Sequence, residues 1–275
     1  MNKIVFTKEE TEDIINLYTK EFLSMNKIGE KYSVSKEVIK RVLKENSIEM
    51  RKGNHTYHAD YNKFETIDSS EKAYWLGFVA ADGCVYLRDD ETNGCISLNI
   101  HEKDKELLEK FNLFMNSNNP IKSIIQNAGF SNNTPMSRLV FNSKKMVYDF
   151  INKGIVQRKS LVLKPPLIEE KYYLPFIMGY FDGDGSIFKT QNKEFGISIE
   201  GTKEILEWIN SILNISSKLE KRNNDNKNNY YIRCGGINKP YNILKKLYDS
   251  SPVYLERKKK IFEELEAVVL GRDTK

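Results

Sequence analysis

The sequence predicts an α+β protein with two pseudo-symmetric αββαββα halves that carry saddle-shaped antiparallel sheets, preceded by a small all-α domain. An apolar stretch ending in Asp-Gly occurs twice, at 75–83 and 177–185, with its glycines and aspartates 102 positions apart. After each copy the hydrophobic pattern changes from a helical to an alternating period. Short amphipathic segments near the N-terminus predict the all-α domain. The expected boundaries are a helical domain at 1–50, a linker at 51–67, and halves at 68–167 and 168–275.

Length and composition limit the possible classes of protein. The chain has 275 residues and a net charge of +5, which permits a polyanionic partner without requiring one. The three cysteines have no metal-ligand spacing, the first residues lack a signal-peptide core, and no apolar run is long enough to span a membrane. We therefore expect a reduced, intracellular (cytoplasmic) protein, and one that is encoded by a bacterium or phage rather than an organelle. The many Lys, Asn and Ile residues suggest an AT-rich genome.

The first fifty residues contain three amphipathic segments. Thr7 and Glu10 fit a capping box that opens the first helix, and Ser35 can cap the third. The exposed face of the third helix is basic, which suits a helix that faces phosphates. The segment 28–43 resembles the helix-turn-helix of resolvase-like and transposase-like DNA-binding domains, with Ser33 at a turn position where that family usually has Gly. A three-helix bundle for protein contacts is the alternative. The candidate DNA contacts here are Lys36, Lys40 and Arg41.

The linker region shows no clear hydrophobic period. It contains His55 and His58, three positions apart, which could bind a metal. No carboxylate or thiol accompanies them at ligand spacing, so the favoured interpretation is that both are ordinary linker residues.

The repeated motif contains the principal candidate site. Gly77 and Gly179 lie on helix faces where a missing Cβ allows two helices to approach closely, and Gly83 and Gly185 suit the left-handed residue that ends a helix. Two such helices packed together would place their terminal aspartates side by side. Like charges at helix C-termini are unfavourable, and bound divalent cations would reverse that penalty. The alternative is that each Asp-Gly forms only a turn. The candidates are Asp82 and Asp184.

The strands expected after each motif have one apolar and one polar face. The apolar face must pack against helices, whereas a polar and partly basic outer face suits a groove of duplex DNA. Ordinary solvent exposure is the alternative for each residue. The outer-face candidates are Tyr86, Arg88, Ser97, Asn99, Arg138, Phe188, Thr190, Ser198 and Arg233.

A basic tetrapeptide near the end of each half is also repeated. Lys159 and Lys258 are 99 positions apart, at equivalent places in the two copies. A charge run is commonly a solvated face, but a repeated lysine can stabilise the charge that develops at a scissile phosphate.

Together these residues resemble the LAGLIDADG homing endonucleases of the single-chain, two-motif type with an N-terminal helix-turn-helix. The resemblance covers about residues 69–269 and implies that Asp82 and Asp184 bind divalent metal with help from the carbonyls of Ala81 and Gly183. It implies Mg²⁺ as the cofactor, with Mn²⁺ or Ca²⁺ able to substitute for binding. It also implies that Lys159 and Lys258 are the peripheral catalytic lysines. The polar strand residue near the hydrolytic water maps to Asn99 and Ser198.

The functional prediction is a monomeric, metal-dependent, site-specific double-strand DNA endonuclease of a mobile genetic element, with internal pseudo-twofold symmetry. By resemblance, its sheets lie in the major groove of a long, nearly palindromic target, and cleavage across the minor groove leaves short 3′ overhangs. Two alternatives use the same scaffold. One is a non-cleaving DNA-binding transcription regulator, and the other is an intron RNA maturase. Retention of both aspartates favours cleavage over regulation.

Overall fold

The computed structural model describes residues 4–21, 23–50, 57–126, 133–189, 195–222 and 227–273. The chain divides into two compact units, one formed by residues 1–59 with 116–119 and the other by 60–115 with 120–275. Within the described ranges, no helix combines the length and apolar character needed to cross a membrane. The cysteines Cys84, Cys95 and Cys234 form no disulfide.

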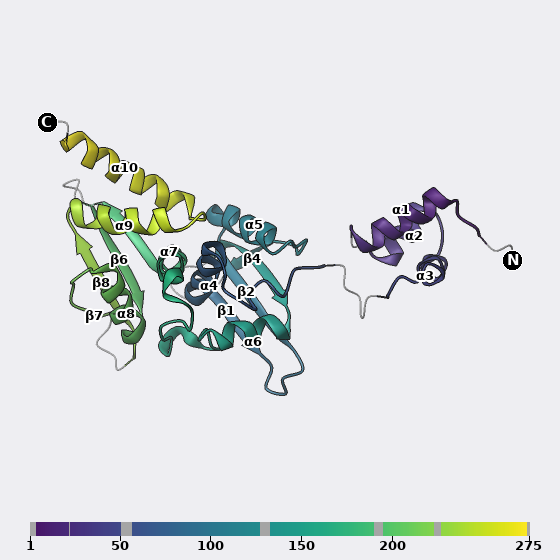
Figure 1. The fold of residues 1–275 in the computed structure, drawn as a ribbon, viewed down its shortest axis with the longest axis horizontal. Helices are drawn as coiled ribbons and strands as arrows, with labels where there is room; N and C mark the ends of the chain where they lie inside the picture. Colours follow the sequence, from purple (N-terminus) through teal and green to yellow (C-terminus); the bar gives the residue numbers. More distant parts are fainter. Residues whose placement is uncertain are drawn as a thin grey trace. The chain divides into compact units, whose positions relative to one another are not determined.

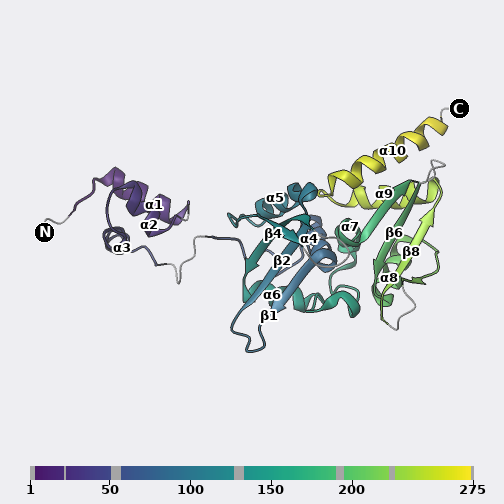
Figure 2. The same ribbon diagram turned by 180° about the vertical axis from the view of Figure 1, so that it is seen from behind.

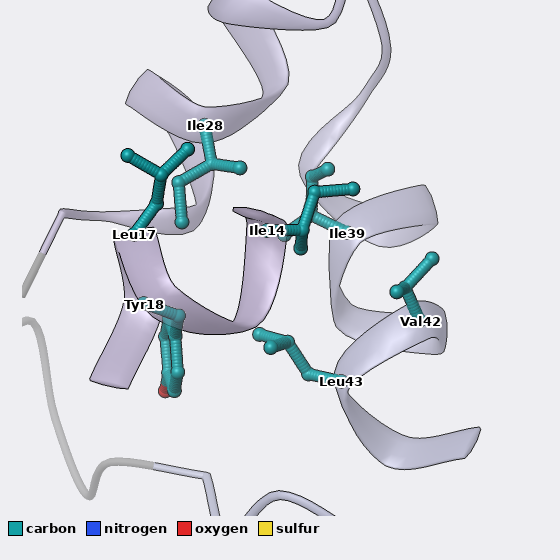
Figure 3. Packing of buried hydrophobic residues seen from close by; sticks show 7 residues of the cluster. All are labelled: Ile14, Leu17, Tyr18, Ile28, Ile39, Val42 and Leu43. Carbon is teal, nitrogen blue, oxygen red and sulfur yellow. The ribbon is translucent and has the colours of Figure 1, made fainter. Parts of the chain in front are cut away.

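The first unit contains three helices, α1 (Lys8–Thr19), α2 (Met25–Lys31) and α3 (Lys36–Glu45). The predicted capping box is confirmed, because the Glu10 N–H donates to the Thr7 hydroxyl and the Thr7 N–H donates to the Glu10 carboxylate. The apolar faces of the three helices close around one small core (Figure 3), formed by Ile14, Leu17, Tyr18, Ile28, Ile39, Val42 and Leu43.

The turn between α2 and α3 is tight. Ser33 has a φ of 54°, in the left-handed region, and the Val34 N–H donates to the Gly29 carbonyl at 2.8 Å. A Cβ on Gly29 would lie 2.5 Å from the Val34 carbonyl oxygen, so this helix position requires glycine. Ser35 is the N-cap residue of α3, although its side chain makes no capping hydrogen bond.

The second unit repeats one order of elements, αββαββα, and confirms the predicted α+β fold. The first copy consists of α4 (Ser70–Asp82), β1 (Gly83–Leu87), β2 (Gly94–His101), α5 (Lys105–Phe114), β3 (Lys122–Gln126), β4 (Thr134–Asn142) and α6 (Lys144–Asn152). The second consists of α7 (Tyr173–Asp184), β5 (Gly185–Lys189), β6 (Phe195–Gly201), α8 (Lys203–Leu213), β7 (Glu220–Lys221), β8 (Tyr230–Gly235) and α9 (Asn238–Ser250), and α10 (Glu256–Asp273) follows.

Each copy forms one four-stranded antiparallel sheet, in the orders β1-β2-β4-β3 and β5-β6-β8-β7. Side chains alternate along the strands: in β1, Val85 and Leu87 are buried, whereas Cys84 and Tyr86 are exposed. Helices α5 and α6 contact the first sheet, and α8 and α9 contact the second. Figures 1 and 2 show α4 and α7 side by side between the two sheets. Among the described residues, the sheet face opposite α5 and α6, and that opposite α8 and α9, carries no helix.

The α4–α7 packing depends on the two motif glycines. A Cβ on Gly77 would overlap the Phe176 carbonyl oxygen, and one on Gly179 would overlap that of Tyr74. The predicted close approach of the helices is therefore confirmed.

The predicted left-handed caps are wrong. Gly83 and Gly185 are extended, with φ of −79° and −98°, because each helix continues directly into a strand. Glycine is needed here for space instead, since a Cβ on Gly83 would lie 2.7 Å from the carbonyl oxygen of Val79 in the last helical turn.

Candidate active site

The ends of α4 and α7 bring the two motif aspartates together. Asp82 is the last residue of α4 and Asp184 the last of α7. The helices are so close there that a Cβ on Gly183 would lie 3.3 Å from the Asp82 carboxyl carbon. The pairing that the repeated motif predicts is therefore present.

The environment of this pair disfavours ionisation. Burial, and then the neighbouring Asp184, raise the pKa of Asp82 to about 6. Burial likewise raises the pKa of Asp184, partly offset by Lys159 and by a hydrogen bond from the Tyr180 hydroxyl. Both effects penalise two adjacent negative charges, and solvent screens part of the penalty because Asp82 is exposed and Asp184 is half-buried. A positive ligand between the carboxylates would relieve the penalty.

Lys258, in the first turn of α10, is enclosed at the end of α7. It is 1% exposed, and its Nζ donates to the carbonyls of Phe181 at 2.6 Å, Asp182 at 2.8 Å and Gly185 at 2.6 Å. An ammonium group has three N–H donors, so these carbonyls use all of them. Burial lowers the pKa of Lys258 to about 8.

Lys159 occupies the equivalent place at the end of α4, in the short 3₁₀ helix η2 (Lys159–Leu161). It is 7% exposed, and its Nζ donates to the Ala81 carbonyl at 2.9 Å. Burial lowers the pKa of this lysine, whereas Asp184 and then Asp82 favour its charged form. The predicted catalytic lysines therefore both reach the helix ends that carry the aspartates.

Asp182 adds a third carboxylate, at the motif position where the first copy has Ala80, and it is the buried one of the three. It is 1% exposed, and its Oδ2 accepts from the Tyr74 hydroxyl at 2.7 Å and from the Leu255 N–H at 2.8 Å. Its Oδ1 has no hydrogen-bond partner among the described residues. Burial raises the pKa of Asp182 to about 6, and Lys258 opposes that shift. Asp182 thus connects α4, α7 and the chain entering α10.

Two pockets flank the aspartate pair. The Asp184 pocket is lined by Asp184, Ala81, Lys159, Tyr180 and Glu200, among others. The Asp82 pocket is lined by residues that include Asp82, Asn99, His101, Asp104, Asp182 and Arg257. The Arg257 Nε donates to both Asp104 carboxylate oxygens at 3.0 and 2.9 Å. Each pocket is therefore lined both by one motif aspartate and by a residue on the outer face of one sheet.

The strand register corrects the predicted equivalence of Asn99 and Ser198. Gly83 pairs with Leu98 in the first sheet, and Gly185 pairs with Ile199 in the second. The residue equivalent to Asn99 is therefore Glu200, which the sequence analysis missed. The alternation in β6 could have identified it, because Ile197 and Ile199 face the core and Glu200 falls on the outer face.

Two predicted outer-face serines are buried. Ser97 is 7% exposed and Ser198 is 8% exposed, so neither presents a free hydroxyl at the surface. Both lie on central strands, between cross-strand neighbours on the same face. Ser97 lies between Cys84 and Val140, and Ser198 lies between Ser186 and Arg233.

The remaining outer-face candidates are exposed where the structure describes them. Tyr86 is 49% exposed and Phe188 is 37% exposed, and Arg138 lies directly opposite Asn99. The Arg88 Nε lies 3.2 Å from Asp90, and the Arg233 guanidinium lies 4.6 Å from the centre of the Tyr231 ring. Thr190 lies outside the described residues.

In the first unit, Lys36 and Lys40 are exposed on α3. Arg41 is less available, because its guanidinium donates to the Ile4 carbonyl and lies 3.9 Å from Glu45. Of the linker histidines, His55 lies outside the described residues, and the backbone N–H of His58 donates to Asn118 at 2.8 Å.

The donor set at the aspartate pair fits a hard divalent cation. Among the described residues, no three or more His, Cys, Asp or Glu side chains are arranged to hold a metal ion together. A metal site here would therefore take only two carboxylate ligands from the protein. Mg²⁺ is commonly bound by one or two carboxylates, completed by water and substrate phosphates. The Ala81 carbonyl already accepts from Lys159, and its second lone pair remains for another partner.

Comparison with protein families gives one match, to the LAGLIDADG-like domain. It covers residues 69–153 and 171–247, which together make up more than half of the chain and contain both motif helices. A search of curated protein sequences gave no match.

Several solved structures are similar to this chain. The LAGLIDADG homing endonuclease I-GzeII in complex with its DNA target has a TM-score of 0.49 and 14% identity, covering 74% of this chain and 90% of that one. I-SmaMI bound to uncleaved DNA in the presence of calcium ions has a TM-score of 0.46 and 13% identity, covering 74% and 92%. The LAGLIDADG homing endonuclease I-LtrWI bound to target DNA has a TM-score of 0.46 and 13% identity, covering 78% and 92%.

Proposed function

Because this chain belongs to the LAGLIDADG-like domain family, we propose that it is a site-specific, metal-dependent double-strand DNA endonuclease. It acts as a monomer, since one chain contains both halves. Its target is a long, nearly palindromic duplex, which it cuts across the minor groove to leave short 3′ overhangs. The gene is part of a mobile genetic element.

One observation carries this proposal: two aspartates adjoin at the ends of α4 and α7, each with a buried lysine from its own half nearby. Placing like charges side by side is costly, and partial desolvation raises the pKa values of Asp82 and Asp184. A protein that only packed two helices together would gain stability by replacing these carboxylates. Their presence is consistent with a site for cations and phosphate.

Asp82 and Asp184 would hold Mg²⁺, with the carbonyls of Ala81 and Gly183 as further oxygen donors. When bound, the metal supplies Lewis-acid activation of water and neutralisation of charge on the phosphate. The chain itself orients the phosphate between the two pockets. Lys159 and Lys258 stabilise the negative charge that develops there, one lysine for each strand.

The outer faces of the two sheets would contact the major groove. Tyr86, Asn99, Arg138 and Arg233 lie on this helix-free face, where hydrogen-bonding and planar side chains can reach base edges. The first unit would add contacts beyond the central site, with α3 as the recognition helix and Lys36 and Lys40 next to phosphates.

The test uses a library of duplexes with a randomised site, incubated with pure protein and Mg²⁺, followed by sequencing of all new ends. We expect paired ends with a fixed short 3′ stagger, at one recurrent sequence. A variant carrying Asp82→Asn and Asp184→Asn should yield none of these ends. The absence of ends with wild-type protein, together with site-selective retention of DNA by both proteins, would replace this proposal with a non-cleaving regulator.

A further inference from the structure

Asp182 is buried near the end of α7, and the proposed function gives it no role. It is 1% exposed, and the equivalent residue of the first copy, 102 positions earlier, is Ala80. Burying a carboxylate is costly, and the cost is tolerated where its hydrogen bonds hold other groups in place. The groups that Asp182 binds therefore indicate what it does.

Asp182 is connected to Lys258 at both ends of the lysine. Its Oδ2 accepts from the Leu255 N–H at 2.8 Å, and the Leu255 carbonyl accepts from the backbone N–H of Lys258 at 3.0 Å. At the other end, the Nζ of Lys258 donates to the backbone carbonyl of Asp182 at 2.8 Å. These three hydrogen bonds close a ring, so both the backbone and the ammonium group of Lys258 are fixed relative to one residue of α7.

Leu255 is the residue directly before α10. Its carbonyl accepts from the N–H groups of Lys258 and Lys259, which are in the first turn of that helix. Leu255 is only 5% exposed, and a buried N–H without an acceptor is costly. Loss of the Asp182 carboxylate would therefore release the start of the helix that carries Lys258.

The first half contributes through Tyr74 on α4. This side chain is fully buried, and its hydroxyl donates to Asp182 Oδ2 at 2.7 Å. The same oxygen thus accepts from one donor of each half, which fixes the direction of the carboxylate. Lys159 is not held in this way, because Ala80 has no side-chain oxygen.

We propose that Asp182 is a positioning residue for Lys258, and that Tyr74 of the first half orients Asp182 for this task. What Lys258 then does rests on the endonuclease function proposed above, whereas the positioning itself requires no DNA. An ammonium group held in place before the substrate binds needs less rearrangement when charge develops on the phosphate. Asp182 acts through Lys258 and not on the phosphate.

The first test measures how well Lys258 is protected in the free protein. Whole protein in chelator is methylated with formaldehyde and a borohydride reductant, and each lysine is followed by mass spectrometry of its peptide. Asp182→Ala should raise the reaction rate of Lys258 by about tenfold or more, because the hydrogen bonds that hold a charged group are lost. Lys159 is the internal control, and its rate should not change. Unchanged labelling of Lys258 would overturn the proposal.

Asp182→Asn separates hydrogen bonding from charge. Its amide oxygen can still accept from Leu255 and Tyr74, so Lys258 should stay protected. Equal gains in the Ala and Asn variants would show that the charge of Asp182 protects the lysine, and would contradict positioning by hydrogen bonds.

Tyr74→Phe tests the contribution of the first half, because it removes only the hydroxyl. It should raise the labelling rate of Lys258, by less than Asp182→Ala does. The matched control is Tyr241→Phe, which removes a hydroxyl 3.4 Å from Glu266 elsewhere in the second copy and should have no effect. No gain with Tyr74→Phe would refute the role of Tyr74.

The second test measures cleavage of the duplex recovered from the randomised library, with a different label on each strand. Asp182→Ala should slow the strand that Lys258→Met slows, by about tenfold or more, and leave the affinity for the duplex unchanged. Asp182→Asn should recover most of this rate. In a protein that already carries Lys258→Met, adding Asp182→Ala should cause little further loss. Additive losses would show that Asp182 does not act through Lys258.

Failure of this inference is distinguishable from failure of the proposed function. If the wild type cleaves no library duplex but Asp182→Ala releases Lys258, the endonuclease proposal fails and the positioning stands. If the wild type cleaves DNA but Asp182→Ala leaves the labelling of Lys258 unchanged, the inference alone is overturned.

Discussion

Asp82 and Asp184 occupy a position that is unfavourable for carboxylates in the metal-free protein. Partial burial and the proximity of Asp184 raise the pKa of Asp82 from its ordinary value of 3.8 to about 6. Because Asp82 is exposed and Asp184 is half-buried, solvent screens part of the cost of keeping both carboxylates ionised at neutral pH. Functional sites commonly keep such costs because a ligand removes them. The cost of these two carboxylates can therefore be tested on the protein alone, without DNA.

We expect the Asp82→Asn, Asp184→Asn variant to be more stable than the wild type without metal at pH 7.5. A raised carboxyl pKa contributes stability that is present below about pH 4 and lost as pH rises through about 6. The wild-type free energy of unfolding should therefore contain a component that falls across this window, and the variant should lack it. Urea unfolding at several pH values in a chelator measures both.

An exposed aspartate provides the control. Asp89→Asn should leave the pH dependence of unfolding unchanged, because Asp89 lies at the surface between β1 and β2. Adding Mg²⁺ should raise the unfolding temperature of the wild type and not that of the double variant. A double variant less stable than the wild type in chelator would show that the carboxylates make favourable contacts in the metal-free state.

At the scale of elements, the α4–α7 contact decides how closely the two halves approach. The carbonyl oxygens of Tyr74 and Phe176 occupy the space that a side chain at Gly179 or Gly77 would need. Backbone atoms cannot move aside as the end of a side chain can. This contact also sets the positions of the aspartates, which follow on the same two helices.

Gly179→Ala should therefore destabilise the second unit by about 3 kcal/mol or more, because relieving the overlap must separate the helices. It should also weaken Mg²⁺ binding, since both carboxylates would move apart. Thermal unfolding and metal titration measure the two effects.

Gly271→Ala is the matched control, in helix α10, where an added Cβ meets nothing within 4 Å. This change should be neutral or stabilise by up to about 1 kcal/mol, because alanine has the higher helix propensity. Similar losses of stability from both substitutions would refute the packing argument.

At the scale of the whole molecule, the basic face of α3 and the two sheets belong to separate compact units. Lys36 and Lys40 are exposed on α3, and their predicted role is to neutralise phosphates rather than to read bases. Such contacts release counterions, so their contribution to binding depends on salt.

Replacing both lysines by alanine should weaken binding to the target and to unrelated duplex by similar factors. The slope of log K against log salt should fall by about 2, because each phosphate contact contributes about 0.9. Affinity measurements at several salt concentrations give the slope. Lys20→Ala with Lys27→Ala, exposed positions outside α3, should leave it unchanged, and an equal effect of this pair would mean that only net charge matters.

The secondary structure and its repetition were largely predictable from the sequence. The apolar period of 3.6 in the motif helices, and its change to 2 in the strands after Gly83 and Gly185, determine element type locally. The candidate aspartates and lysines followed from their repetition. The backbone conformation of Gly83 and Gly185 was wrongly predicted. A glycine at the end of a helix is needed either because its φ is positive or because other atoms leave no space for a Cβ. Only the path of the strand that follows shows which reason applies.

The sequence alone determined the fold class, the duplicated order of elements and the pairing of Asp82 with Asp184, because periodicity and spacing express these directly. Tertiary structure decided which side chains share a pocket. The register of β6 makes Glu200 the counterpart of Asn99, burial removes Ser97 and Ser198 from the surface, and the path of α10 surrounds Lys258 with carbonyls. These properties depend on hydrogen bonding and packing between segments far apart in the chain, which no local pattern encodes.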